Sequence, residues 1–213
     1  RDLYRIKKVG HCGTLDPAAT GLLVCLLGRA TKLSQELMAD DKTYEGAITF
    51  GASTDSYDAD GQVTETKEVP PLTLEDLNEA ASHFTGDQMQ QPPMVSAVKK
   101  DGVALYKLAR KGREVEREPK LVHIFQHDFT KYEAPIARFR VRCTKGTYVR
   151  SLAHELGQRL GCGAHLKHLH RTQSGAFNVA DAIRLEDLCH LPDEELPRRL
   201  MTLLDLARML QPV

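Results

Sequence analysis

The chain has 213 residues, and its 29 Lys and Arg balance its 29 Asp and Glu, so the formal net charge at pH 7 is zero. A chain of this length buries roughly 70% of the surface that its unfolded form exposes, which predicts a stable core. No apolar run is long enough for a transmembrane helix, so no membrane span is predicted.

Five cysteines without a CxxC pair favour free thiols in a reducing compartment over a disulfide-linked scaffold. The expected location is therefore the cytoplasm. An organelle is the alternative, because the chain begins at Arg1 rather than Met and an upstream targeting segment would then be missing.

Charge is distributed unevenly along the chain. Residues 40–87 hold 12 acidic and 2 basic side chains, residues 99–120 hold 8 basic and 4 acidic, and residues 138–171 hold 8 basic and 1 acidic. This segregation predicts a basic face and an acidic back, as a protein that binds a polyanion requires. On charge alone, ordinary solvated faces are an equally weighted alternative.

The first half of the chain predicts short elements. In chain order they are a buried strand or the start of a buried helix at Leu22–Leu27, a helix at Ala30–Met38, a strand at Lys42–Gly51, a turn at Asp58–Gly61 and an extended or loop segment at Gln90–Met94. Thr73 is a good N-cap because Asp76 occupies the third helical position, which predicts a helix ending near Gly86.

The second half predicts longer elements. In chain order they are a hairpin turn at Asp101-Gly102, a brief helix at Leu105–Arg110, strands at Leu121–Phe129 and Ala137–Cys143, a helix at Tyr148–Gly161, a strand at Ser174–Val179 and a largely helical tail. Strands and helices are mixed without a βαβ rhythm. The predicted fold class is therefore α+β, with a mainly antiparallel, mixed sheet and flanking helices.

The stretch GHCGTLDPAATGLL, residues 10–23, places one acid, Asp16, in a glycine-rich loop. It matches neither the phosphate-binding pattern GxxxxGK[ST] nor GxGxxG, so a nucleotide site is not favoured. Pro17 restricts the backbone of Asp16, and a carboxylate on such a stiff loop can be aimed at a substrate. A turn or helix N-cap is the plainer interpretation, and the loop alone favours it.

Two further features carry candidate chemistry. Arg150 lies in the first turn of the helix predicted after CTKGTY, where a cation is disfavoured, so it indicates either a buried carboxylate partner or a solvated side chain. The run CGAHLKHLHR matches no standard zinc spacing, so no metal site is predicted. The spacing of His165 and His168 allows a short helix there, and the basic character of the run fits RNA contact better than metal binding.

Six blocks now form a pattern: GHCGTLDPAATGLLVCLLGRATK, DKTYEG, GASTDSYDADGQ, PPMVSAVKKDGVALYKLARKG, RCTKGTYVRSLAHELG and GCGAHLKHLHRTQSGAF. Their order resembles that of the TruB-type tRNA pseudouridine synthases, from about Val9 to Phe177. The resemblance implies the pseudouridine synthase fold in residues 1–213, with an RNA-clamping insertion at about residues 88–112. It also implies a missing N-terminal lysine-proline segment and an absent C-terminal PUA domain.

The resemblance further implies isomerisation of uridine 55 in the T-loop of tRNA by a monomer that binds the T-arm stem-loop, without cofactor, metal or membrane. By this resemblance Asp16 is the catalytic carboxylate and Arg150 is its charge partner. Tyr44 and Leu169 would contact the flipped base, His11 would fill the gap that the base leaves in the RNA stack, and Tyr148 and Lys145 would line the pocket. The residues expected to contact the rest of the RNA are Lys107, Arg110, Lys111 and Arg171. Without the resemblance, Tyr44, Leu169 and His11 would be a strand-packing tyrosine, a core leucine and a loop histidine.

The chain departs from the family pattern at Cys12, where threonine is usual, and at His170, where arginine is common. Two alternatives stay open. One is a catalytically silent RNA-binding, tRNA-folding protein of the same fold, against which the intact Asp16, Tyr44 and Arg150 argue. The other is a guide-RNA-directed pseudouridine synthase, against which the KDGVALYKLARKG insertion and the lack of a lysine-rich tail argue.

Overall fold

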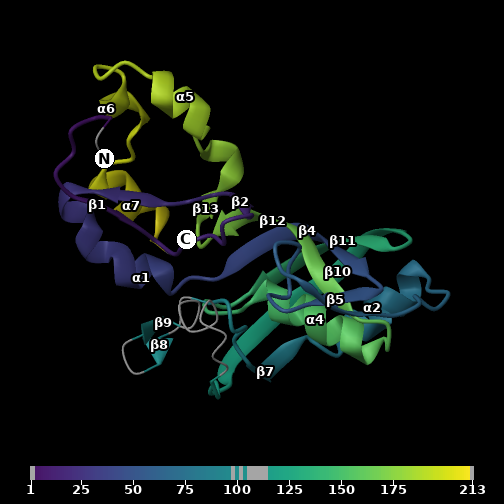
Figure 1. Ribbon diagram of the computed structural model, residues 1–213. Helices are drawn as coiled ribbons and strands as arrows, with labels where there is room; N and C mark the ends of the chain where they lie inside the picture. Colours follow the sequence, from purple (N-terminus) through teal and green to yellow (C-terminus); the bar gives the residue numbers. More distant parts are fainter. Residues whose placement is uncertain (1–2, 97–98, 101–102, 105–114, 212–213) are drawn as a thin grey trace.

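A seven-stranded sheet forms the body of the protein in the computed structural model, which describes residues 3–96, 99–100, 103–104 and 115–211 (Figure 1). Its strands run in the order β13 (Phe177–Asn178), β12 (Ala164–Ser174), β4 (Lys42–Phe50), β11 (Ile136–Cys143), β10 (Lys120–Glu133) and β7 (Gly86–Gln90). All of these pairs are antiparallel, and the short β2 (Thr20–Gly21) adds to β12 in parallel. The predicted α+β class with a mainly antiparallel sheet is confirmed.

Alternation along β11 explains why one face of the sheet is covered. Phe139 and Val141 are buried in the main core, whereas Arg138, Arg140 and Arg142 are exposed on the other face. The buried face receives two helices, α2 (Leu74–Ser82) on β10 and α4 (Val149–Arg159) on β12. The active-site candidates on β4, β12 and α4 therefore share the helix-covered face.

Helix boundaries follow their local chemistry. Thr73 and Asp76 form the predicted capping box, with Thr73 Oγ1 accepting from Asp76 N at 3.2 Å and Thr73 N donating to Asp76 Oδ2 at 2.8 Å. The helix ends at Ser82. Gly86, which has a φ of 91°, is the first residue of β7. The predicted helix after Tyr148 is α4, with Tyr148 as its N-cap.

The helical segment predicted at Ala30–Met38 is present, as a 3₁₀ helix, η1 (Gly28–Leu33), followed by α1 (Ser34–Met38). Other predicted elements differ from the structure. The short helix that the spacing of His165 and His168 allowed is not formed, because both residues lie in strand β12. The apolar run Leu22–Leu27 contains only a three-residue strand, β3 (Cys25–Leu27). Two register shifts interrupt the alternation of β12, which hid this strand from sequence patterns. The strand expected at Ser174–Val179 is reduced to β13.

A smaller lobe joins both ends of the described chain. Strand β1 (Val9–His11) pairs with β3, and their core includes Cys12, Leu26, Leu37 and Leu206. Leu206 lies on α7 (Leu203–Met209), which follows α5 (Leu185–His190) and α6 (Leu196–Arg199). Tyr4 Oη donates to the carbonyls of Leu188 at 2.5 Å and Leu191 at 3.0 Å. The N-terminal segment is thus fastened to the C-terminal helices.

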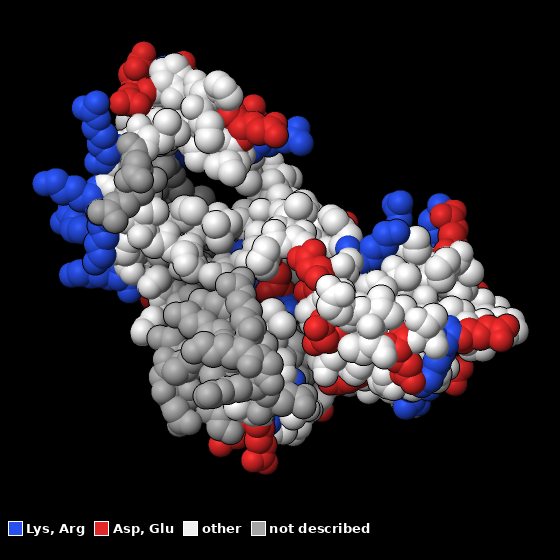
Figure 2. Space-filling view, in the orientation of Figure 1, with Lys and Arg blue, Asp and Glu red and all other residues white. Residues whose placement is uncertain are grey.

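The remaining strands form two small hairpins. β5 (Ala52–Thr54) pairs with β6 (Val63–Thr66), and β8 (Lys99–Lys100) pairs with β9 (Val103–Ala104). The second pair flanks the predicted hairpin turn, whereas the turn itself and the predicted helix at Leu105–Arg110 lie outside the described residues. Figure 2 shows Lys and Arg along the outer edge of the smaller lobe and more Asp and Glu over the body. Across the described ranges, none of the helices has the length and apolarity to span a membrane.

Candidate active site

The loop after β1 presents Asp16 on a tightly constrained backbone. Its carbonyl accepts from Ala19 N at 2.9 Å, which closes a turn around Pro17. Gly21, with a φ of 101°, lets the loop reach β12, because a Cβ there would come within 2.3 Å of the carbonyl oxygen of Arg171. Glycine is therefore required where the loop meets the sheet.

Arg150 holds the carboxylate of Asp16 in a two-pronged contact. Arg150 Nε donates to Asp16 Oδ2 at 2.8 Å, and Nη2 donates to Oδ1 at 3.1 Å. The arginine side chain is 4% exposed and the aspartate side chain 40%. Paired guanidinium–carboxylate bonds of this kind fix orientation as well as charge. Arg150 therefore has the carboxylate partner that its place in the first turn of α4 indicated.

A second acid, which sequence reasoning missed, also contacts Arg150. Nη1 lies 3.3 Å from Asp58 Oδ2 and donates to the carbonyl of Ser56 at 3.1 Å, while Nη2 donates to the carbonyl of Val95 at 2.9 Å. The buried guanidinium is thus bound from three segments of the chain. The sequence indicated only a turn at Asp58, although the acid-rich GASTDSYDADGQ block was a usable signal.

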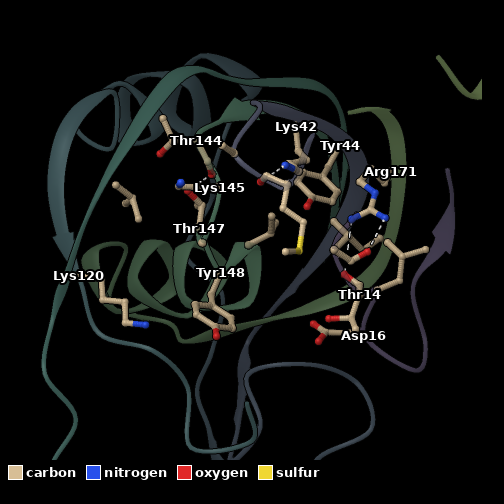
Figure 3. Close-up of a pocket in the computed structure, with 18 of the residues that line it drawn as sticks. Thr14, Asp16, Lys42, Tyr44, Lys120, Thr144, Lys145, Thr147, Tyr148 and Arg171 are labelled. Carbon is tan, nitrogen blue, oxygen red and sulfur yellow. Dashed lines mark hydrogen bonds between the residues drawn. The ribbon is translucent and has the colours of Figure 1, made fainter. Parts of the chain in front are cut away.

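A cavity of ≈ 800 Å³ opens beside Asp16 (Figure 3). Asp16 and Thr14 lie at one side of it, with Tyr148 and Lys120 across the opening. The predicted site residues that line it are Asp16, Tyr44, Lys145, Tyr148, Leu169 and Arg171. His11 is exposed on β1 and is not among the described lining residues, and Arg150 lies buried beneath Asp16.

Tyr44 is held neutral at the cavity wall. Burial raises the pKa of its phenol to about 12, against the opposing effect of the neighbouring Arg171 guanidinium. Leu169, on the adjacent strand β12, is 8% exposed. A neutral aromatic ring and a leucine side chain in one cavity can pack against a flat, uncharged base.

Arg171 anchors the Asp16 loop. It is 1% exposed, and its guanidinium donates to the carbonyls of Leu22 at 2.7 Å, Gly13 at 3.1 Å and Thr14 at 3.5 Å. The RNA contact that the sequence predicts for Arg171 stays a prediction. Its observed contacts are those of a residue that shapes the loop.

Two lysines that were not predicted also line the cavity. Lys120 begins β10. Lys42 is 6% exposed, and its ammonium group donates to the carbonyls of Met38 at 2.8 Å and Asp40 at 2.5 Å, at the end of α1. Burial lowers the pKa of Lys42. The DKTYEG block signalled Lys42, whereas nothing in the sequence singled out Lys120.

Residues 1–149 match the family model described as TruB family pseudouridylate synthase (N terminal domain). The chain belongs to the TruB family. Residues 150–213 match the model described as tRNA pseudouridylate synthase B C-terminal domain. The TruB relatives include tRNA pseudouridine synthase B of Opitutus terrae, 53% identical over 201 residues that cover 94% of this chain and 83% of the relative. That of Syntrophotalea carbinolica is 43% identical over 208 residues, covering 98% and 68%.

Solved structures of other proteins have the same fold as this TruB-family chain. A chain in a Cbf5–Nop10–Gar1 complex superimposes with a TM-score of 0.70 at 26% identity, covering 99% of this chain and 53% of that one. One in an H/ACA RNP bound to a substrate RNA has a TM-score of 0.66 at 23% identity, covering 94% and 49%. The chain therefore spans about half the length of these solved chains.

The TruB cavity gathers only part of the predicted basic surface. Lys145 and Arg171 from residues 138–171 line it and Arg150 is buried beneath Asp16, whereas the three arginines of β11 lie on the opposite face of the sheet. Lys107, Arg110 and Lys111 lie outside the described residues. Within the part of the chain that is described, no three His, Cys, Asp or Glu side chains are grouped as metal ligands.

Proposed function

We propose that this chain is a stand-alone enzyme that converts uridine 55 in the T-loop of tRNA to pseudouridine, with Asp16 as the essential carboxylate. The observation that carries the proposal is the Arg150–Asp16 pair at the wall of the cavity, in a chain of the TruB family. In this isomerisation the N1–C1′ bond breaks and a C5–C1′ bond forms. The C5 proton is released and N1 gains a proton, so the base keeps its oxidation state.

Asp16 supplies an ionised and oriented carboxylate. Arg150 binds both of its oxygens, and the remaining exposure of the side chain faces the cavity. Because Arg150 is itself held by Asp58 and Ser56, the carboxylate does not need to reorganise before reaction. A fixed carboxylate is what covalent or general-base assistance at the nucleoside requires.

The target base must leave the T-loop stack, which costs a few kcal/mol. Tyr44 and Leu169 line the cavity and would receive the flipped uracil. Lys120 and Lys145 are at the same cavity, where their ammonium groups would meet phosphates of the bound strand. Lys107, Arg110 and Lys111 of the insertion would hold the rest of the T-arm, and His11 would fill the vacated stack.

A guide-RNA-directed synthase is the second candidate, because the solved chains of similar fold include one in an H/ACA RNP. It is less favoured, since relatives named tRNA pseudouridine synthase B are 43% and 53% identical, against 26% for the chain of the Cbf5 complex. A silent RNA-binding protein is disfavoured by the complete Asp16–Arg150–Asp58 arrangement. The monomeric state, the cytoplasmic location and the single-domain boundaries stay predictions.

The test is release of tritium from tRNA labelled at C5 of uridine, which isomerisation expels. The chain alone, without guide RNA, should release tritium from tRNA and from a T-arm stem-loop, and should not release it when cytidine replaces uridine 55. Asp16→Asn should bind the same RNA and lose on the order of 10⁴-fold in rate. Activity of Asp16→Asn within tenfold of the unmodified chain would refute the assigned carboxylate, and a strict need for guide RNA would favour the second candidate.

A further inference from the structure

Tyr57 and His154 stack beside the Arg150 contacts. Their ring centroids are 3.9 Å apart and their planes are inclined by 12°. His154 follows Arg150 by four residues on α4, so both side chains leave the same side of the helix. Both therefore meet the loop between β5 and β6, Arg150 through its guanidinium and His154 through its ring.

The backbone of Tyr57 is left-handed, with a φ of 66°. That conformation is unfavourable for a residue with a large side chain and persists only where the surroundings fix it. Here Tyr57 N donates to the carbonyl of Thr54 at 3.3 Å, and its own carbonyl accepts from Leu166 N at 2.9 Å. The stack on His154 supplies the contact that holds the side chain itself.

The left-handed residue separates the two groups that bind Arg150 Nη1. Ser56 offers its carbonyl at 3.1 Å and Asp58 its carboxylate at 3.3 Å. Ser56 Oγ also donates to Asp58 Oδ1 at 2.5 Å, which ties the two residues together across Tyr57. If the backbone of Tyr57 returned to an extended conformation, the chain direction between Ser56 and Asp58 would change, and both could not meet the same nitrogen.

His154 makes this contact as a ring rather than as a hydrogen-bonding group. Its Nδ1 atom is buried and has no hydrogen-bond partner within the residues that the structure describes. Burial lowers the pKa of His154, so the imidazole is neutral near pH 7. Neither His154 nor Tyr57 is among the described residues that line the cavity, so neither is placed to bind RNA there.

We propose that His154 and Tyr57 are positioning residues for the isomerisation. Their stack holds the β5–β6 loop so that Ser56 and Asp58 fix Arg150, and Arg150 in turn fixes the carboxylate of Asp16. This inference rests on the proposed function, because it assigns the stack to the same reaction. Its distinguishing property is that loss of the stack slows the chemical step and leaves RNA affinity unchanged.

The experiment compares variants in single-turnover tritium release at saturating enzyme, with RNA affinity measured separately. His154→Ala should slow the rate roughly 10- to 100-fold, the range expected for a small misplacement of a reacting group, with affinity within twofold. His154→Phe keeps a flat ring and should restore the rate to about threefold below the unmodified chain or better. Gln158→Ala is the matched control, because Gln158 lies one turn further along α4 and bonds Ser53 Oγ at 3.4 Å. It should leave the rate unchanged.

Tyr57→Gly tests the backbone directly. Glycine adopts positive φ without help, so Tyr57→Gly combined with His154→Ala should be faster than His154→Ala alone. Equal rates for His154→Ala and the unmodified chain, or a loss that appears in affinity rather than rate, would overturn the proposal. So would a His154→Phe variant as slow as His154→Ala.

A readout without turnover separates this inference from the proposed function. Because Arg150 Nε donates to Asp16 Oδ2, the Arg150 Nε–H signal in an NMR spectrum of the unmodified chain should be protected from exchange. His154→Ala should broaden that signal or remove it, and His154→Phe should keep it. A signal unchanged in His154→Ala contradicts the positioning role even if the chain proves to have another activity. Absence of tritium release from the unmodified chain contradicts the proposed function instead.

Discussion

Asp16 and Asp58 are bound to the same guanidinium, that of Arg150, which donates to both oxygens of Asp16 and meets Asp58 Oδ2 at 3.3 Å. The two acids lie 42 positions apart in the sequence and come from different loops. One buried cation therefore compensates two carboxylates. Its removal would leave both without a partner in this contact, and its replacement by a smaller cation would leave at least one poorly bound.

Arg150→Ala should reduce the single-turnover rate roughly 10²- to 10³-fold, because the bonds that orient Asp16 are lost. Arg150→Lys keeps the charge but not the planar fork, so it should recover less than a tenth of the original rate. The measurement is tritium release at saturating enzyme, with circular dichroism to confirm folding. A lysine variant within twofold of the unmodified chain would show that charge alone is sufficient.

Arg171→Met should separate loop anchoring from RNA contact. Loss of the bonds to the carbonyls of Gly13, Thr14 and Leu22 should displace the Asp16 loop and slow the chemical step about 10²-fold. The affinity for tRNA should change less than threefold. If Arg171 instead binds a phosphate, affinity should fall and its salt dependence should flatten while the rate at saturation holds.

Replacement of Lys107, Arg110 and Lys111 together by alanine should weaken tRNA binding. Each lost phosphate contact should flatten the slope of log affinity against log salt by about 0.7 in single-stranded regions. The rate at saturation should stay close to that of the unmodified chain. Arg138→Ala with Arg140→Ala, on the helix-free face of the sheet, is the matched control and should leave the slope unchanged. Equal slopes in both variants would remove the insertion from the RNA-binding surface.

His127 should make the fold acid-sensitive. Burial between Phe129 and Phe139 lowers its pKa to about 4, from 6.5 in the unfolded chain. The unfolded state therefore binds more protons between these values, so the stability that the neutral ring contributes is complete above pH 6.5 and is lost as pH falls towards 4. The loss is on the order of 3 kcal/mol. Urea unfolding at pH 7.5 and pH 5 should show a smaller loss for His127→Leu than for the unmodified chain, and equal losses would contradict this origin.

Patterns that repeat locally were predictable, and contacts between distant segments were not. Alternation identified β4 and β11, and Thr73 with Asp76 identified the start of α2. The bulges of β12 broke its alternation, so His165 and His168 seemed compatible with a helix. Asp16 was singled out as the lone acid of a glycine-rich loop and Arg150 as a cation in the first turn of a helix, and the family resemblance supplied their roles. Asp58 was hidden because its local pattern is that of an ordinary turn, and its partner lies 92 residues later in the chain.

The anchors of the Asp16 loop also set when that loop can become functional during synthesis. Arg150 follows Asp16 by 134 residues, so the loop leaves the ribosome before its charge partner has been made. At ribosomal speed the gap lasts about 7 to 27 s, and Arg171, which fastens Gly13 and Thr14, emerges later still. Throughout that interval the nascent loop has neither its charge partner nor its scaffold. The carboxylate of Asp16 therefore acquires its fixed orientation only after the chain through β12 has been synthesised.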